Sequence, residues 1–412
     1  MLPLLRDRRF QAFWLGQATS VVGVGVTVVA LPGLLLMHRT GTDFAYVLAA
    51  EAGTGAFFTI LGGVFADRYS RSMLMAVSDV LCVAGVGAYL ALGANGPLWA
   101  LLLSAGVIGV GAGLYQPAHR AAMPQIVAED LLERANALDS ATKRIGMAAG
   151  SALGGLLVAT VSAEAALVVN IATYAVSLAT LIFLKLPPIA APGSGGGIAA
   201  VFREAGEGVR IVLKNRWATA IMVQGTIQVF FLFAPNYVLT AIVAVERYPK
   251  GAYGWIMTAG FVGALAGSLV AGRIKTKRPG LVAMNALVPC AALPVCLVWD
   301  VPLWTFCAIA FLAWAGISVF FIFWLSGLSR AFPPEVHGRV FGIEHLLTFC
   351  LDPVAKAVIP AFALAIGMGV FGIVAAVVLL VSTYAVLLVP GAITLSTPSD
   401  ARRPPSVPTT AH

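Results

Sequence analysis

Charged residues inside long apolar runs are the residues of this 412-residue chain that could do chemistry. Asp352 and Lys356 stand four residues apart, as do Asp139 and Lys143, the spacing at which opposite charges meet along a helix. In an apolar medium a charge costs at least about 2.5–3.5 kcal/mol, so each one needs a partner or a task. Such groups can form ion pairs or bind and release protons. The candidates are Glu51, Asp139, Arg144, Glu344, Asp352 and Lys356.

The composition indicates that these charges lie in a lipid bilayer. Hydrophobic residues make up 59% of the chain and charged residues only 11%, against about 25% charged in soluble domains. The mean hydropathy is +0.92. The net charge of +8 could suggest a nucleic-acid partner, but the basic residues fall between apolar runs rather than on one polar face. We therefore expect a membrane protein that binds no nucleic acid.

The cysteines and the N-terminus exclude further classes. The five Cys residues lie in apolar runs without the spacing of a metal site, so we expect small buried hydrophobes and no metal or cofactor. The first apolar stretch, 10–37, is too long for a cleavable signal peptide, and no small-residue cleavage site follows it.

The apolar runs predict an all-α polytopic membrane protein with twelve transmembrane helices. A membrane-spanning helix needs about 20 mostly apolar residues. The predicted spans are 10–37, 44–65, 73–94, 97–117, 136–160, 165–185, 217–244, 251–272, 279–298, 302–328, 339–362 and 368–390.

Lys and Arg are distributed unequally between the two ends of these spans. With the N-terminus inside, the outer loops hold only Arg39, Arg247 and Lys250, and most other basic residues fall in inner loops. An excess of Lys and Arg marks cytoplasmic loops. The sequence therefore predicts a multi-pass protein of the inner (plasma) membrane with both termini in the cytoplasm.

The chain divides near its middle into two six-span halves. The linker opens with Pro-Pro and Gly-Ser-Gly-Gly-Gly, which predicts flexibility. It ends in a sequence typical of a short amphipathic helix on the inner membrane surface. The tail is rich in Pro, Ser and Thr, so we expect it to be disordered. The predicted units are the N-terminal half 1–186, the linker 187–216, the C-terminal half 217–395 and the tail 396–412.

The loop between spans 2 and 3 carries a family resemblance. Its pattern Gly63-x-x-x-Asp67-Arg68-x-x-Arg71 resembles the signature loop of the major facilitator superfamily, whose fold is two six-helix halves. Ser70 and Ser72 depart from that pattern, where Gly and a second base are usual. The resemblance implies that Asp67 latches the halves at the inner end of span 11, through Arg339 or the N–H groups that open the helix. The alternative is that these charges only set the topology.

A second motif lies in span 5. Gly146, Gly150, Ser151, Gly154 and Gly155 resemble the superfamily's antiporter motif, with Ser151 in place of proline. That motif is associated with exporters, although small residues at this spacing also serve general helix packing. Residues 4–17 look similar to the start of the branch that contains the enterobactin exporter and macrolide-efflux proteins. The resemblance implies drug:proton antiport.

The intramembrane charges suggest how protons could be coupled to transport. Spans 5 and 11 occupy related positions in the two halves, so we hypothesise an ion pair between Arg144 and Asp352. Protonation of Asp352 or Glu51 would weaken such pairing and bias the inward/outward equilibrium. Glu51 could instead be an outer-interface carboxylate beside Arg39. Span 4 lacks the Arg that drug antiporters often carry.

Spans 1, 4, 7 and 10 are expected to line a cavity between the halves. Aromatic and amide side chains with little charge suit a bulky, amphipathic compound. The candidate lining residues are Gln17, Tyr115, Gln224, Gln228, Asn236 and Trp324.

The sequence thus predicts a monomeric efflux transporter that moves a small drug-like or siderophore-like compound by alternating access, driven by proton antiport. A lipid or lysolipid flippase, or an importer on the same fold, is the alternative. An enzyme would need a loop-borne cluster of His, Asp or Glu, which the short outer loops lack. A phosphate-binding G-x-x-x-x-G-K-[ST] motif is also absent from the sequence, which argues against ATP as the energy source.

Overall fold

The computed structural model describes residues 4–184, 186, 207, 209–333, 336–349 and 351–396, and every regular element within these ranges is helical. The side chains of Asp67 and Arg68 lie outside the described part of the chain. So do nearly all of the predicted tail and most of the predicted linker, of which 209–213 is helical. The all-α prediction is confirmed for the described residues.

The first six long helices form what we call the N-half. Its first helix is capped by Asp7, whose carboxylate accepts a bond from the Arg9 N–H at 2.7 Å. The second helix is capped by Thr40, which accepts from the Asp43 N–H at 3.1 Å. The helices are α1 (Arg8–Leu35), α2 (Gly41–Arg68), α3 (Arg71–Leu92), α4 (Leu98–Ile126), α5 (Leu132–Thr160) and α6 (Ala163–Phe183), with short 3₁₀ turns η1 (Leu4–Arg6) and η2 (Glu129–Leu131).

The remaining helices form the C-half, in which three of the predicted spans are interrupted. Span 7 is α8 (Arg216–Gln228), a π-helical turn η3 (Val229–Phe233) and α9 (Ala234–Arg247). Proline divides span 9, because its ring cannot continue the hydrogen-bond ladder. Span 9 is α11 (Pro279–Ala286), η4 (Val288–Ala291) and α12 (Ala292–Cys296), and span 11 is α14 (His337–Phe349) and α15 (Asp352–Ile366). The other helices are α10 (Ala252–Ala271), α13 (Leu303–Ala331) and α16 (Met368–Leu387).

Each predicted span corresponds to a helix or a run of helices. In the part of the chain that the structure describes, ten runs are long and apolar enough to cross a membrane. The two others are α5, which has 29 residues but carries several charges, and the divided α14–α15. The count of twelve therefore stays a prediction.

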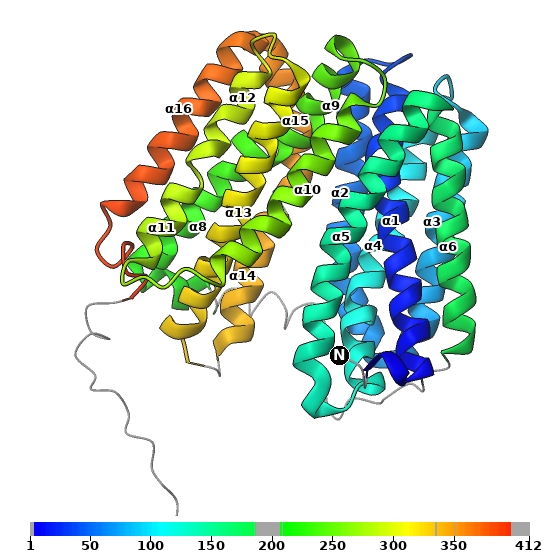
Figure 1. The fold of residues 1–412 in the computed structure, drawn as a ribbon, viewed down its shortest axis with the longest axis horizontal. Coiled ribbons are helices and arrows are strands. Elements are labelled where there is room, and N and C mark those ends of the chain that lie inside the picture. Colours follow the sequence, from blue (N-terminus) through cyan, green and yellow to red (C-terminus); the bar gives the residue numbers. More distant parts are fainter. Residues whose placement is uncertain are drawn as a thin grey trace, which may run out of the picture.

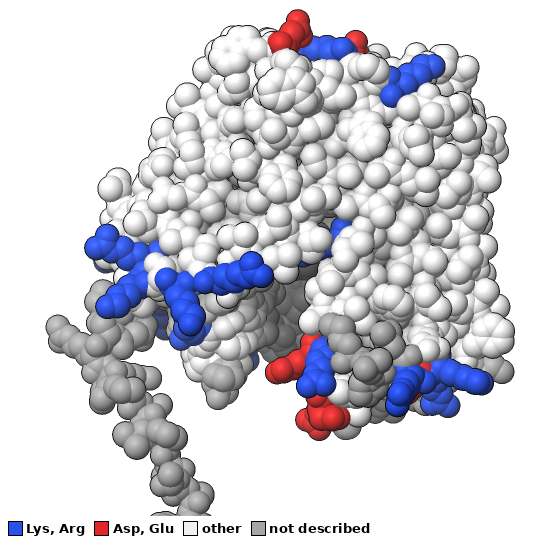
Figure 2. Space-filling view, in the orientation of Figure 1, with Lys and Arg blue, Asp and Glu red and all other residues white. Residues whose placement is uncertain are grey.

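The halves lie side by side, approach each other at one end and separate toward the end where the chain begins (Figure 1). Figure 2 shows a hollow between them at that second end, between α5 on one side and α10 and α14 on the other; we call it the inner hollow. We call this end the basic end and the opposite one the far end. Basic residues beside the helix ends there include Arg6, Arg8, Arg9, Lys275, Lys277 and Arg330.

Helices α5 and α10 meet backbone to backbone toward the far end. A Cβ atom on Gly155 would lie 3.0 Å from both the Gly254 Cα and the Gly251 carbonyl oxygen. Gly251, at the turn before α10, has φ +84°, a left-handed conformation that favours glycine. Ser151 joins the contact, with its Oγ 3.0 Å from Thr258 Oγ1. Glycine is thus required here by packing.

The other glycines of the span-5 motif face α1 within the N-half. A Cβ on Gly150 would come within 2.9 Å of the Gly25 Cα, and one on Gly154 within 2.8 Å of the Val26 carbonyl oxygen. Gly146 faces Val21 in the same way. The motif therefore has two faces, one that holds α5 to α1 and one, Ser151 and Gly155, that holds the halves together.

Substituting Gly155→Val should weaken the far-end contact between the halves. Overpacking costs about 1–3 kcal/mol, so disulfide cross-linking of a Ser151→Cys/Thr258→Cys pair should slow by about tenfold or more. The measurement uses a background in which the native Cys residues are replaced by Ala. Gly87→Val is the matched control, since nothing lies within 4 Å of a Cβ there. Equal rates in the two variants would contradict this account of the contact.

Candidate functional site

The loop between α2 and α3 is bonded to the end of the N-half. Ser70 has φ −59°, so the turn requires no glycine at this position. Its hydroxyl donates to the Leu186 carbonyl oxygen at 2.7 Å, and the Leu186 N–H donates to Ser72 Oγ at 3.2 Å. The two serines that depart from the signature therefore both bind Leu186, three residues after the end of α6.

Arg71 and Gly63 are the two other described positions of the signature loop. Arg71 is buried beside Gln125 near the end of α4, and with the Gln125 amide assigned so that its oxygen faces the guanidinium, Nη1 and Nε donate to that oxygen at 2.6 and 3.1 Å. Gly63 has nothing within 4 Å of a Cβ, so packing in this structure does not require a glycine there. Arg71 thus ties the start of α3 to α4.

Arg339, the predicted partner of Asp67, pairs with another carboxylate. Its Nη1 lies 3.2 Å from Glu207 Oε2, and both side chains are more than two-fifths exposed. An exposed pair contributes only about 0–1 kcal/mol, so it can exchange partners readily. The latch between Asp67 and Arg339 stays a prediction.

A polar cluster lies between α1, α4 and α5. Asp139 accepts from Lys143 Nζ at 2.8 Å, which confirms the predicted i,i+4 pair. The same carboxylate lies 3.0 Å from His119 Nε2. The His119 ring stacks on Phe13, with 4.5 Å between centroids, and on Tyr115, with 5.6 Å.

His119 was missed as a functional candidate by sequence reasoning. It is 1% exposed, and its Nδ1 has no hydrogen-bond partner among the described residues. The sequence feature that could have identified it is a histidine within the largely apolar sequence of α4. The cluster combines an imidazole, a carboxylate and an ammonium group, and could therefore hold or pass a proton.

The predicted cavity residues lie instead largely inside their own halves. Gln17 is 3% exposed and accepts from the Tyr115 hydroxyl at 2.7 Å, while Gln224 is 2% exposed and donates to Thr383 Oγ1 at 3.2 Å. Asn236 is 6% exposed. The bonds that Gln17 and Gln224 make thus stay within one half, while the buried amide oxygens of Gln224 and Asn236 have no hydrogen-bond partner among the described residues. Gln228 and Trp324 line only a small cavity of about 30 Å³, with Glu344 at its wall.

A second charged cluster joins the two halves toward the far end. Asp352 Oδ2 lies 2.7 Å from Lys356 Nζ, which confirms this predicted pair. Lys356 also lies 5.5 Å from the centre of the Tyr237 ring. Glu51 borders a cavity of about 130 Å³ together with Tyr237. This contact combines α2 of the N-half with α9 and α15 of the C-half.

Glu51 is not paired with Arg39, the alternative partner that the sequence suggested. Arg39 Nε donates to the Ala94 carbonyl oxygen at 2.8 Å, and its Nη1 lies 3.7 Å from Asp43. Asp79 likewise has no basic partner among the described residues and accepts from the Ser177 hydroxyl at 2.6 Å. Glu51 therefore lies on the N-half helix that packs against α15, at the cavity that it lines together with Tyr237.

The hypothesised ion pair between Arg144 and Asp352 is not formed. Arg144 Nη1 donates to the Ala264 carbonyl oxygen at 3.2 Å and to Ser318 Oγ at 3.1 Å. Asp352 is occupied by Lys356 instead. The physical reason is that α5 packs against α10, whereas α15 packs against α2, so the two charges lie on different inter-half contacts.

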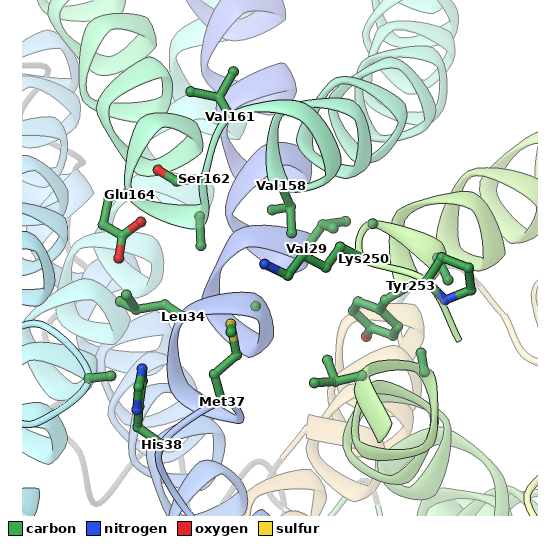
Figure 3. A pocket seen from close by; sticks show the side chains of 18 of the residues that line it. Val29, Leu34, Met37, His38, Val158, Val161, Ser162, Glu164, Lys250 and Tyr253 are labelled. Atoms are coloured by element: carbon green, nitrogen blue, oxygen red, sulfur yellow. The ribbon is translucent and has the colours of Figure 1, made fainter. Parts of the chain in front are cut away.

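A further pocket of about 390 Å³ lies at the far end, between the halves (Figure 3). Val29, Leu34 and Val158 of the N-half face Tyr253 of the C-half across it. His38, Glu164 and Lys250 supply its charged and titratable lining. Gly251 belongs to this pocket and also to the contact with Gly155, so the glycine contact lies along its wall.

The architecture and the motifs can now be compared with known proteins. The family model of the Major Facilitator Superfamily matches residues 13–343 of this chain. The chain belongs to the major facilitator superfamily. This confirms the family that the signature loop predicted and places the protein among transporters rather than enzymes.

Within the superfamily, the chain is similar to several bacterial efflux proteins. It is 25% identical over 362 residues to the multidrug efflux pump Tap of Mycolicibacterium fortuitum, covering 81% of this chain and 84% of that one. It is 27% identical over 375 residues to the enterobactin exporter EntS of Salmonella choleraesuis, covering 83% of each. Macrolide efflux protein A of Streptococcus pyogenes is 22% identical over 249 residues, or 58% of this chain and 60% of that one.

Solved structures show the same fold at low sequence identity. The nucleoside transporter NupG aligns with a TM-score of 0.73 and 12% identity, over 92% of this chain and 98% of that one. A POT family transporter in complex with 5-aminolevulinic acid aligns with a TM-score of 0.72 and 10% identity, over 92% and 95%. The predicted polytopic membrane fold is thereby confirmed.

Substituting Asp139→Asn should lower the thermal unfolding temperature of the purified protein. The change leaves Lys143 without its carboxylate and weakens the bond to His119, a loss of about 1–3 kcal/mol. The double variant Asp139→Asn/Lys143→Gln should recover part of that loss, because it leaves no unpaired charge. Asp300→Asn is the control, since its carboxylate side chain is 91% exposed beside Arg247. An unchanged unfolding temperature in Asp139→Asn would contradict a stabilising role for the cluster.

Proposed function

We propose that this protein is an efflux transporter that exports a small amphipathic compound, drug-like or siderophore-like, across the inner (plasma) membrane. The observation that carries the proposal is the asymmetry of the inter-half contact. Ser151 and Gly155 of the exporter-type motif hold the halves together toward the far end, while the inner hollow opens at the basic end (Figure 2). The excess of Lys and Arg favours a cytoplasmic basic end. A state open on that side would take its substrate from the cytoplasm.

The comparisons support the direction of transport. The named relatives are a multidrug efflux pump, a macrolide efflux protein and an enterobactin exporter, each similar to this chain across more than half its length. We infer that this chain exports as well, as a monomer with both termini in the cytoplasm.

Proton antiport would supply the driving force. Glu51 of the N-half borders the same cavity as Tyr237 of the C-half, the ring of Tyr237 lies beside Lys356, and Asp352 holds Lys356 in place. Protonation of either carboxylate removes a charge from a contact that joins the halves, and so links proton binding to the inward/outward equilibrium. His119 and Asp139 are a second candidate, located within the N-half.

Inverted membrane vesicles test the proposed direction. A deletion strain screened across antibiotics and iron-limited media identifies a compound that the cell no longer tolerates or releases. Inverted vesicles that contain the protein should then accumulate that compound when their lumen is acidified. Accumulation in right-side-out vesicles instead would identify an importer, and transbilayer movement of labelled lysolipid without movement of the compound would identify a flippase.

Substituting Asp352→Asn should reduce proton-driven accumulation in these vesicles by about tenfold or more, because the Asn side chain cannot exchange a proton. Energy-independent exchange of the same compound should persist, and the variant should remain in the membrane. Asp43→Asn is the control, because that carboxylate lies beside Arg39 in the first turn of α2. Full proton-driven accumulation in Asp352→Asn would exclude this carboxylate from coupling.

A further inference from the structure

Arg144 is a charged residue in the middle of a membrane-length helix. It lies 12 residues after the start of α5 and 16 before its end, or about 18 and 24 Å along the helix. Its side chain is half-buried and reaches across to the C-half, where Nη1 donates to the Ala264 carbonyl oxygen on α10 and to Ser318 Oγ on α13. It therefore stands where α5, α10 and α13 meet.

The charge of Arg144 is not neutralised by the protein. No carboxylate in the described part of the chain lies within ion-pair distance of its guanidinium, although Lys143 and Lys356 each have one at 2.8 and 2.7 Å. A guanidinium cannot lose its proton in a protein, so it cannot escape the cost of burial by becoming neutral. A charge without a counter-ion at this depth marks a candidate ligand site, because a bound anion would supply the missing charge.

The Arg144 guanidinium also has N–H donors that make no hydrogen bond to the described part of the protein. Both of its bonds to protein use Nη1, and Nη2 and Nε have no partner among the described residues. A guanidinium presents five N–H groups in a planar fork, and its Nε and Nη2 edge matches two oxygens of one oxyanion. The protein atoms that Arg144 does contact are a carbonyl and a hydroxyl, which hold the fork in place without adding negative charge.

The geometry points to Arg144 as the site that binds an anionic group of the transported compound, a carboxylate or similar oxyanion on an apolar or aromatic body. This inference rests on the proposed function and names the class of its substrate: organic anions in preference to cations. An anion bound on the Nε and Nη2 edge would neutralise Arg144 at the junction of the two halves. Substrate binding would then change the electrostatics of the contact that must break and re-form during transport.

Two dyes with the same xanthene ring and opposite charge test the inference. Purified full-length protein in nanodiscs is titrated with fluorescein, an anion, and with rhodamine 6G, a cation, by fluorescence anisotropy. The wild type should bind fluorescein more tightly. Arg144→Gln should weaken fluorescein binding by about tenfold or more and leave rhodamine 6G binding unchanged or stronger, since a bidentate charged contact is lost. Arg144→Lys should restore part of the preference.

Two controls separate anion binding from a structural role. Ser318→Ala removes a contact of Arg144 but no charge, and should keep the preference for fluorescein. Arg247→Gln removes a charge beside the exposed Asp300 and should change neither affinity. A wild type without preference for the anion, or an Arg144→Gln variant that weakens both dyes equally, would overturn the inference. Because binding needs neither a gradient nor a direction, this result is independent of the vesicle test of export.

Discussion

The structure depends on one close contact, in which the backbones of α5 and α10 touch at Gly155, Gly251 and Gly254. A helix that approaches another this closely can do so only where side chains are absent, so the contact has a fixed register. That register places Ser151 opposite Thr258 and, farther toward the basic end, Arg144 opposite Ala264. The position of the unpaired guanidinium therefore follows from the glycines more than two turns away from it.

The two contacts between the halves differ in the charges that they contain. Where α2 meets α9 and α15, acidic and basic residues are both present: Lys356 contacts Asp352 and the ring of Tyr237, and Glu51 lies on the facing helix α2. Where α5 meets α10 and α13, the described residues supply a cation and neutral acceptors only. In the proposed mechanism, a proton would change one of the charges at the first contact, and an anionic solute would complete the charge balance of the second.

The sequence predicted the helices well, because the length of an apolar run determines whether it can span a bilayer. It also predicted the pairs Asp139–Lys143 and Asp352–Lys356, since a spacing of four residues sets distance within one helix. The partners of Arg144 and Arg339 could not be predicted in this way. They depend on how helices far apart in the chain are rotated and packed, and Ala264 contributes only a backbone oxygen that any residue would offer.

The bonds of the two loop serines, Ser70 and Ser72, also could not be predicted from the sequence. Ser70 and Ser72 depart from the signature, yet both are bonded to the backbone of Leu186. A hydroxyl that binds a distant main-chain group leaves no pattern in the sequence. His119 is similar, because its neighbours Phe13 and Asp139 come from α1 and α5, and only the packed N-half brings them together.

The bonds at Leu186 and Glu207 have a mechanical consequence. Leu186 is anchored to the α2–α3 loop of the N-half, and Glu207 is paired with Arg339 at the start of α14 in the C-half. The chain between them is thus attached at each end to a surface that must move when the halves rock. The two anchors stand 21 residues apart in the sequence, which at about 3.3–3.6 Å per residue sets an upper bound of roughly 70 Å on the distance between them. Both anchors lie at helix ends, so a pull between the halves along this connection would act on the α2–α3 loop and on the start of α14.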